Sequence, residues 1–286
     1  MSWTEIAPGL RVRQSRAYRM NSTLLLHPDG AALIDPGVLP SEMDEIAAAV
    51  RATDARHTML VFTHAHWDHV LGRVWWPALG TIAHGEFAAD LRRGEHRVDH
   101  AARDFVRGAG EPWDAVFEAF TPDLPVRGER PLQIGAWSLV FRDAFGHSDS
   151  QMSVHLPDQR VLIAADMLSD IELPILNRPP EVYRSTLQTL RPLMESGEIE
   201  TLVPGHGSIA TGAAAMARLR RDLGYLDALE GGVQESHARG EALEAARQRL
   251  APLNFIAADA AFPMDEIHHE NIRIAFEATT AAGERP

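Results

Sequence analysis

The 286-residue chain contains no cysteine. Disulfides, thiolate metal ligands and thiol nucleophiles are therefore excluded, and a bound metal would need imidazole nitrogen or oxygen ligands. The chain also lacks any run of about eighteen uncharged apolar residues, the length that a membrane-spanning helix requires. We therefore expect no membrane partner.

Positive charge is scarce as well. The 27 lysine and arginine residues stand against 40 aspartate and glutamate residues, which gives a formal net charge of −13. Such a chain repels phosphate backbones, so a nucleic-acid partner is not expected. The first residues, Met1 to Ile6, lack the basic and apolar regions of a secretory signal, and on that ground we expect a cytoplasmic protein. A hydrophobic content of 45% is that of a globular protein with a sizeable core.

Short β-type runs and turn signals alternate near the start of the chain. Runs at Leu10–Arg13, Thr23–His27 and Ala31–Asp35, with a Pro-Asp-Gly turn at 28–30, predict hairpins. Ser41–Val50 then fits a helix with Ser41 as its N-cap residue, and Thr58–Phe62 fits a buried strand.

A second strand-rich segment lies between Pro131 and Asp166, with strands predicted at Trp137–Phe141, Gln151–His155 and Arg160–Ala164. The strand Thr81–His84 and the polar, mostly helical stretch Gly85–Phe120 separate the two strand-rich segments. The remaining predictions are a helix near Pro180–Met194, a strand at Thr201–Pro204 and helices after Gly212. Strands that alternate with helices in this way favour an α/β sandwich.

The segment Thr63–His69 places three histidines and an aspartate within six positions, directly after an apolar strand. In an extended segment His64 and His66 project from the same side, whereas Asp68 and His69, on the following turn, can face a second point nearby. Neutral imidazole and carboxylate are suitable ligands for zinc, iron or manganese. One loop can thus serve two metal ions, provided that another group bridges them.

Three further candidate ligands follow later strands, one ligand after each strand. His147 lies in a Gly-His-Ser turn, Asp166 ends an apolar run, and His206 lies in a Pro-Gly-His-Gly sequence. Each metal needs more donors than the first loop supplies, so we expect these residues to complete the site.

This pattern resembles that of the metallo-β-lactamase-fold hydrolases, in the glyoxalase II and lactonase-like branch. The similarity runs from about residue 20 to residue 210 and includes Asp35-Pro36-Gly37, which looks like an early Asp-Pro-Gly element of that family. The resemblance implies one domain, residues 1–286, with the αββα sandwich fold. It further implies a helical cap over the site at 85–125 and a helical C-terminal extension at 213–286.

The resemblance also implies how two divalent ions, zinc in the first place and iron or manganese otherwise, would be held. The first metal would bind His64, His66 and His147, the second would bind Asp68, His69 and His206, and Asp166 would bridge them. A bridging hydroxide would then hydrolyse an ester, lactone or thioester of a small molecule, with Asp68 as the catalytic proton acceptor. True β-lactamases of this fold often use a cysteine ligand, which this chain lacks.

Several alternatives stay open at this point. A glyoxalase II-like thioesterase would cluster basic residues, and a homoserine lactonase would carry a tyrosine shortly after the bridging aspartate, where Met167–Asp170 stands here. A nuclease would have a basic surface. A persulfide dioxygenase would hold a single iron ion with part of the same ligand set. A protein that only binds a ligand would have lost some of the metal-binding residues. The chain could also form a homo-oligomer, and its sequence does not decide this.

We expect the remaining histidines and the arginine run near residue 220 to have structural and not catalytic roles. The histidines outside the pattern are expected to be exposed or hydrogen-bonded, with His84 bordering the site. His268, His269 and the run Arg218–Arg221 are expected on solvated helix faces. The cap and the 171–180 loop show no clustered lysine or arginine, and we expect apolar residues to line a pocket for an uncharged acyl group: Trp67, Phe87, Leu173, Ile175 and Leu176.

Overall fold

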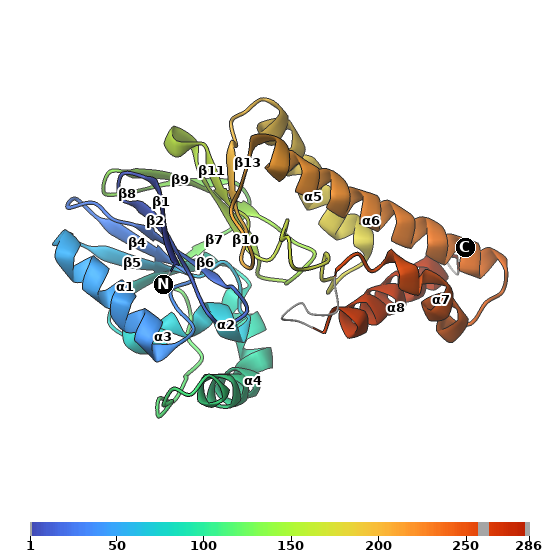
Figure 1. Cartoon of the computed structure of the whole chain (residues 1–286), viewed down its shortest axis with the longest axis horizontal. Coiled ribbons are helices and arrows are strands. Elements are labelled where there is room, and N and C mark those ends of the chain that lie inside the picture. The colour runs from blue at the N-terminus through green and yellow to red at the C-terminus, as the bar shows by residue number, and fades with distance from the viewer. Residues whose placement is uncertain (1, 257–262, 284–286) are drawn as a thin grey trace.

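The structure, a computed structural model, describes residues 2–256 and 263–283. Two β-sheets pack face to face, and helices cover the outer face of each sheet (Figure 1). The predicted α/β sandwich is therefore confirmed.

The first sheet has seven strands in the order of the sequence. The first four pair antiparallel, and the later ones pair parallel from β4 onward. The predicted hairpin region, residues 10–35, forms three successive antiparallel strands of this sheet. Its strands are β1 (Ser2–Ala7), β2 (Leu10–Gln14), β3 (Asn21–Leu25), β4 (Ala31–Ile34), β5 (Thr58–Val61), β6 (Gly80–His84) and β7 (Leu124–Val126).

The second sheet has six strands in the order β13-β12-β11-β10-β9-β8. Its parallel pair is β11 and β12, which carry the two predicted ligands Asp166 and His206 just beyond their ends. The strands are β8 (Arg130–Ile134), β9 (Trp137–Asp143), β10 (Met152–Leu156), β11 (Val161–Ile163), β12 (Thr201–Val203) and β13 (Ala210–Thr211).

The core between the sheets follows from alternation along the strands. In β9, Trp137, Leu139 and Phe141 are buried while the residues between them are only partly buried. They meet apolar side chains of the first sheet, among them Leu25 and Val61. Because side chains alternate across a strand, each sheet presents its other face to helices.

Helices from the first half of the chain cover the first sheet. The first of them, α1 (Pro40–Thr53), shows that the prediction of Ser41 as an N-cap residue was wrong. It begins at Pro40 after Leu39, and the Ser41 hydroxyl donates to Glu111 Oε1 at 2.7 Å instead of capping the helix. Proline suits a first turn because its fixed φ is helical and its missing N–H would have no partner there. The other helices on this side are α2 (Trp67–Val70), α3 (Gly72–Trp75) and α4 (Phe87–Gly108).

The expectation of a helical cap over 85–125 is correct only as far as α4. Residues 111–122 form no helix, and β7 at 124–126 joins the sheet edge beside β6. Trp113 and Phe117 of this segment are buried in the core beneath α1 and α4. Between residues 112 and 118, exposed positions alternate with buried or partly buried ones, which is the period of an extended backbone and not of a helix.

The second sheet is covered by α5 (Pro180–Glu195) and by the first of the C-terminal helices, α6 (Gly212–Ala238). Beyond α6, α7 (Leu243–Leu250) and α8 (Met264–Gly283) pack back against it, away from the sandwich (Figure 1). The helical extension is thus confirmed where it is described, and 257–262 and 284–286 lie outside the described residues. Within the described ranges, no helix is both long and apolar enough to cross a bilayer.

Candidate metal centre

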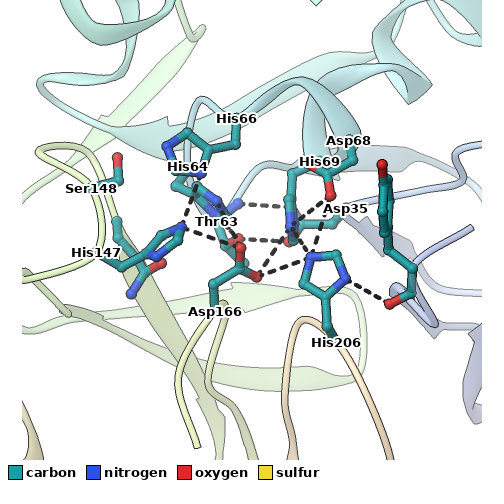
Figure 2. A network of polar contacts seen from close by, with 12 residues as sticks. Asp35, Thr63, His64, His66, Asp68, His69, His147, Ser148, Asp166 and His206 are labelled. Atoms are coloured by element: carbon teal, nitrogen blue, oxygen red, sulfur yellow. Dashed lines mark hydrogen bonds and ion pairs between the residues drawn. The ribbon is translucent and has the colours of Figure 1, made fainter. Parts of the chain in front are cut away.

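The predicted ligands all lie at strand ends along one edge of the sandwich, and the structure brings all seven together (Figure 2). The loop after β5 carries four of them, the β9–β10 connection carries one, and the ends of β11 and β12 carry one each. Polar side chains from four segments that are remote in sequence therefore converge on a small volume.

The first group consists of His64, His66, His147 and Asp166, whose potential ligand atoms all lie within 4.8 Å of one another. His147 Nε2 lies 2.9 Å from His66 Nδ1 and 3.2 Å from Asp166 Oδ2. His64 Nε2 lies 3.4 Å from the same carboxylate oxygen. Three nitrogens and one oxygen thus face a common point.

The second group consists of Asp68, His69 and His206. His206 Nε2 lies 3.3 Å from His69 Nε2 and 3.3 Å from Asp68 Oδ2. Asp166 faces this group with its other oxygen, Oδ1, which lies 3.1 Å from His69 Nε2 and 3.6 Å from His206 Nε2. The two oxygens of Asp166 therefore point to two different groups.

The donor atoms fit metal ions. Nitrogen ligands about 2.0–2.1 Å from a tetrahedral zinc ion lie roughly 3.3 Å apart, which is the His69–His206 spacing. Among the described residues, His64 Nε2 and Asp166 Oδ1 are buried polar atoms without a hydrogen-bond partner. Buried polar atoms usually have hydrogen-bond partners, so these two atoms have the free lone pairs that a metal ion would need.

The electrostatics of the two groups differ. Part of His66 is exposed to solvent, but desolvation by the surrounding protein and the neighbouring imidazoles lower its pKa to about 4, so this residue is neutral and able to ligate at neutral pH. Burial also opposes protonation of His69 and His206, but the nearby carboxylates outweigh it and raise the pKa of both. A metal ion at the second group would therefore displace protons as it binds.

Hydrogen bonds behind the ligands fix their orientation. Asp35 ends β4, accepts from the Thr63 N–H at 2.8 Å, and lies 2.8 Å from His69 Nδ1 with its other oxygen. His206 Nδ1 lies 3.0 Å from the Tyr18 carbonyl. Each contact at Nδ1 turns the Nε2 atom of the imidazole toward the centre.

Gly205 explains the Pro-Gly-His-Gly sequence. A Cβ atom at this position would lie 2.0 Å from Asp166 Oδ1 and 3.0 Å from the Ala165 carbonyl carbon. Only glycine lets the His206 loop approach the Asp166 carboxylate this closely.

Hydrogen bonds and ion pairs join the cap helix α4 to the residues that follow His147. Asp90 of α4 accepts hydrogen bonds from Ser148 Oγ at 2.7 Å and Ser150 Oγ at 2.8 Å, directly after His147. Asp149, between these serines, pairs with Arg93 at 3.1 Å and with Arg178 at 2.7 Å. The expectation that arginines do not cluster near the site was therefore wrong. The fold brings Arg93 of the cap and Arg178 of the 171–180 loop together, and both pair with Asp149.

A cavity of about 270 Å³ opens beside His66, the exposed member of the first ligand group. Of the five residues expected to line a pocket, only Trp67 lines this one. Phe87 is buried against Phe62, and Leu173 and Leu176 are buried in the core beneath α5 and α6. The cavity is lined by Ala65, His66, Trp67, Asp90, Arg93, Gly94 and Val98.

Glu172 is a residue that no sequence motif singled out. It is 3% exposed, and burial raises the pKa of its carboxyl to about 7, with the charges of His206 and Asp166 acting on it. Its position six residues after Asp166, in an irregular loop, carries no sequence signal. Glu172 thus adds a further carboxyl group whose charge acts on the centre.

The other histidines mostly match expectation. His155 is buried, and its Nε2 lies 3.2 Å from the Glu198 carbonyl oxygen, while His100 is exposed beside Asp104. His84 joins neither ligand group and lies 3.3 Å from Asp143. The side chain of His96 lies outside the described residues, and His27 and His57 are not buried.

The solvated-face expectation was wrong for His268 and for Arg218. His268 is 1% exposed and lies between Tyr225 and the Leu250 carbonyl, because α8 packs this face onto α6. Arg218 donates to the Leu168 and Ser208 carbonyls and so supports the loops that carry Asp166 and His206. His269 is exposed as expected.

Comparisons with known proteins identify a family and a shared fold. The family model described as the metallo-beta-lactamase superfamily matches residues 17–206. The acyl-coenzyme A thioesterase MBLAC2 of Bos taurus is 27% identical over 160 residues, which cover 53% of this chain and 56% of that protein. The chain thus spans about half the length of this curated relative.

Solved structures share the fold at low identity. The sec-alkylsulfatase Pisa1 of a Pseudomonas species superposes with a TM-score of 0.70 at 15% identity, covering all of this chain and 52% of that one. A metallo-beta-lactamase family protein of Thermus thermophilus gives 0.67 at 18% identity, with 98% and 95% covered. A beta-lactamase domain protein of Burkholderia ambifaria gives 0.68 at 17%, with 99% and 89% covered.

Proposed function

The chain belongs to the metallo-beta-lactamase superfamily, and from this premise we propose that it is a binuclear metal-dependent hydrolase of small carbonyl substrates. Esters, lactones and thioesters are the substrate classes concerned. The observation that carries the proposal is the position of Asp166, whose two oxygens face two separate groups of ligand atoms.

In this proposal, His64, His66 and His147 hold one divalent ion, Asp68, His69 and His206 hold the other, and Asp166 bridges the two. We take zinc as the first choice of metal and iron or manganese as the alternatives, since imidazole and carboxylate ligands suit all three. Two such ions would lower the pKa of a bound water toward neutrality and polarise the substrate carbonyl.

The protein's own residues would supply position and proton transfer. Asp68 is buried beside His206, and the imidazoles around it hold the pKa of its carboxyl below the usual range despite burial. It is thus ionised and is the proposed proton acceptor during attack on the carbonyl. Asp35 and the Tyr18 carbonyl would keep His69 and His206 in the productive tautomer.

The cavity beside His66 supports a small acyl group as the part of the substrate that binds there. Its volume of about 270 Å³ equals roughly that of nine water molecules. Trp67, Val98 and Ala65 form its apolar lining, which suits a short hydrocarbon chain. The similarity to an acyl-coenzyme A thioesterase further supports acyl thioesters among the substrates to be tested.

Relative turnover tests the proposal. The zinc-loaded protein is offered an aliphatic lactone, an aryl ester, an acyl thioester and a bis-aryl phosphodiester, and kcat/KM is measured for each. We expect at least one carbonyl substrate to exceed the phosphodiester. A phosphodiester that exceeds every carbonyl substrate by tenfold, about 1.4 kcal/mol in the barrier, would contradict it.

A further inference from the structure

Gly94 lies in the interior of the cap helix α4 and lines the cavity beside His66. Glycine destabilises the interior of a helix relative to alanine, because its backbone loses more conformational freedom on folding. A residue without a side chain at this position therefore indicates a requirement that comes from outside the helix.

Two structural reasons for glycine do not apply at this position. The backbone of Gly94 does not have the positive φ that favours glycine. A Cβ atom here would have no atom of a described residue within 4 Å, apart from its two chain neighbours and the local backbone of the helix. Neither the backbone conformation nor close packing against the described residues therefore requires glycine.

The open space lies on the face of α4 that carries Asp90 and Val98. Residues four positions apart lie on one face of a helix, and Asp90, Gly94 and Val98 follow one another at that spacing. All three line the cavity. Asp90 accepts a hydrogen bond from Ser148 Oγ, and Val98 is 1% exposed, so this face is turned toward the sandwich. A side chain at position 94 would accordingly point into the cavity.

The lining of the cavity suits an uncharged occupant. Trp67 and Val98 contribute apolar surface to it. The guanidinium of Arg93 pairs with Asp90 at 3.2 Å and with Asp149 at 3.1 Å. Both charged residues of the lining, Arg93 and Asp90, are thus already paired within the protein, which favours an apolar chain over an ion as the group that binds here.

The cavity extends along α4 from the ligands toward Gly94. Asp90 marks the end beside the ligands, because the Ser148 hydroxyl that it accepts from directly follows His147. A helix rises 1.5 Å per residue, so Gly94 lies about 6 Å further along the helix axis and Val98 about 12 Å. An acyl chain whose carbonyl group lies at the ligands would therefore pass Gly94 with the carbons remote from the carbonyl.

We propose that Gly94 is a specificity-determining residue, which sets the length of the acyl chain that the cavity accepts. This inference rests on the proposed function and narrows its substrate class to esters and thioesters of straight-chain aliphatic acids. Each methylene group that becomes buried in the transition state raises kcat/KM about fourfold. A side chain at position 94 fills the space of the remote methylene groups and leaves the space beside the carbonyl free.

Gly94→Leu tests the proposal, with 4-nitrophenyl acetate and 4-nitrophenyl hexanoate as substrates of the zinc-loaded protein. We expect the ratio of kcat/KM for hexanoate to that for acetate to fall at least tenfold, while the value for acetate changes less than about threefold. An unchanged ratio, or an equal loss for both esters, would overturn the proposal.

Two further variants keep this comparison interpretable. Gly94→Ala should lower the same ratio by about threefold, and it serves in place of the leucine variant if that protein has a lower urea midpoint than the parent. Gly224→Leu is the matched control, because Gly224 is an exposed glycine of α6 whose Cβ would likewise have no described atom within 4 Å. The control should keep the parent's ratio.

A binding measurement separates this inference from the proposed function. Ethylphosphonate and hexylphosphonate are the probes, since the phosphonate oxygens can ligate metal ions while the chain enters the cavity, and calorimetry gives their affinities for zinc-loaded parent and Gly94→Leu. We expect only hexylphosphonate to bind the variant more weakly, at unchanged zinc content. A parent that shows this pattern but hydrolyses no ester would defeat the proposed function alone. The same chain-length preference in parent and variant, or no binding of either probe, would defeat the role of Gly94.

Discussion

In the proposed mechanism, Asp68 serves both as a metal ligand and as the proton acceptor. Its carboxylate is buried beside His206 Nε2, so its replacement removes a metal contact and a proton acceptor together. We expect Asp68→Ala to lower kcat/KM by at least about a thousandfold. His100→Ala, at an exposed residue of the cap helix, is the control and should leave activity within about twofold. Comparable losses in both variants would contradict the assignment.

Gly205 offers a test of the centre that needs no substrate. In Gly205→Ala the new Cβ would lie 2.0 Å from Asp166 Oδ1, so the carboxylate or the His206 loop must move. We expect the variant to retain less than one metal equivalent per chain where the parent retains two, measured by elemental analysis after dialysis. Gly224→Ala, on α6 with no atom within 4 Å of the new methyl group, is the matched control and should bind metal like the parent.

At the scale of the elements, α8 determines how the loop after Asp166 lies. Asn271 accepts the Leu176 N–H at 3.0 Å and donates to the Pro174 carbonyl and to the Tyr225 hydroxyl. These bonds join the C-terminal extension to the segment that carries Glu172. The extension therefore holds in place the loop that carries Glu172.

Asn271→Ala should consequently destabilise the protein and loosen this loop. It leaves buried backbone groups at Pro174 and Leu176 without partners, which costs about 1–3 kcal/mol for each group. We expect a lower urea midpoint and faster proteolytic cleavage near residue 175. Glu270→Ala, the neighbouring exposed partner of Arg273, should change stability by less than about 1 kcal/mol. An equal shift of the urea midpoint in both variants would argue against the role of Asn271 in holding this loop.

The sequence predicted the elements and ligands that local patterns encode. The His64–His69 cluster and the single ligands after later strands are recognisable from spacing, and the strand-end contexts of His147, Asp166 and His206 are those found. Tyr18, Asp90 and Glu172 were missed, because they reach the centre only through tertiary contacts between loops remote in sequence. The same reason explains the clustering of Arg93 with Arg178.

At the scale of the whole molecule, a buried acid makes stability depend on pH. Asp222 on α6 is 1% exposed, and burial raises the pKa of its carboxyl from 3.8 to about 6 even though Arg221 opposes the shift. The folded chain then binds more protons than the unfolded chain between these values. The contribution of Asp222 to the free energy of unfolding is therefore complete below about pH 4, and it is lost as the pH rises through 6.

We therefore expect the Asp222 contribution to weaken by up to about 3 kcal/mol between about pH 4 and pH 7. Urea unfolding of metal-free protein across this range measures the slope, and Asp222→Asn, which cannot ionise, isolates the contribution of this group. The parent should lose stability relative to the variant as pH rises. Parallel pH profiles for the two proteins would show that Asp222 titrates normally.

The contact between Tyr18 and His206 joins residues 188 positions apart, across the two sheets. A chain whose first sheet alone has formed holds His64, His66, Asp68 and His69, yet it still lacks His147, Asp166 and His206. The proposed site is therefore complete only after segments remote in sequence have come together, and we expect high-affinity metal binding to follow that step. On this reasoning a metal ion would bind to a chain whose two halves have already joined, and it would stabilise that arrangement without directing its formation.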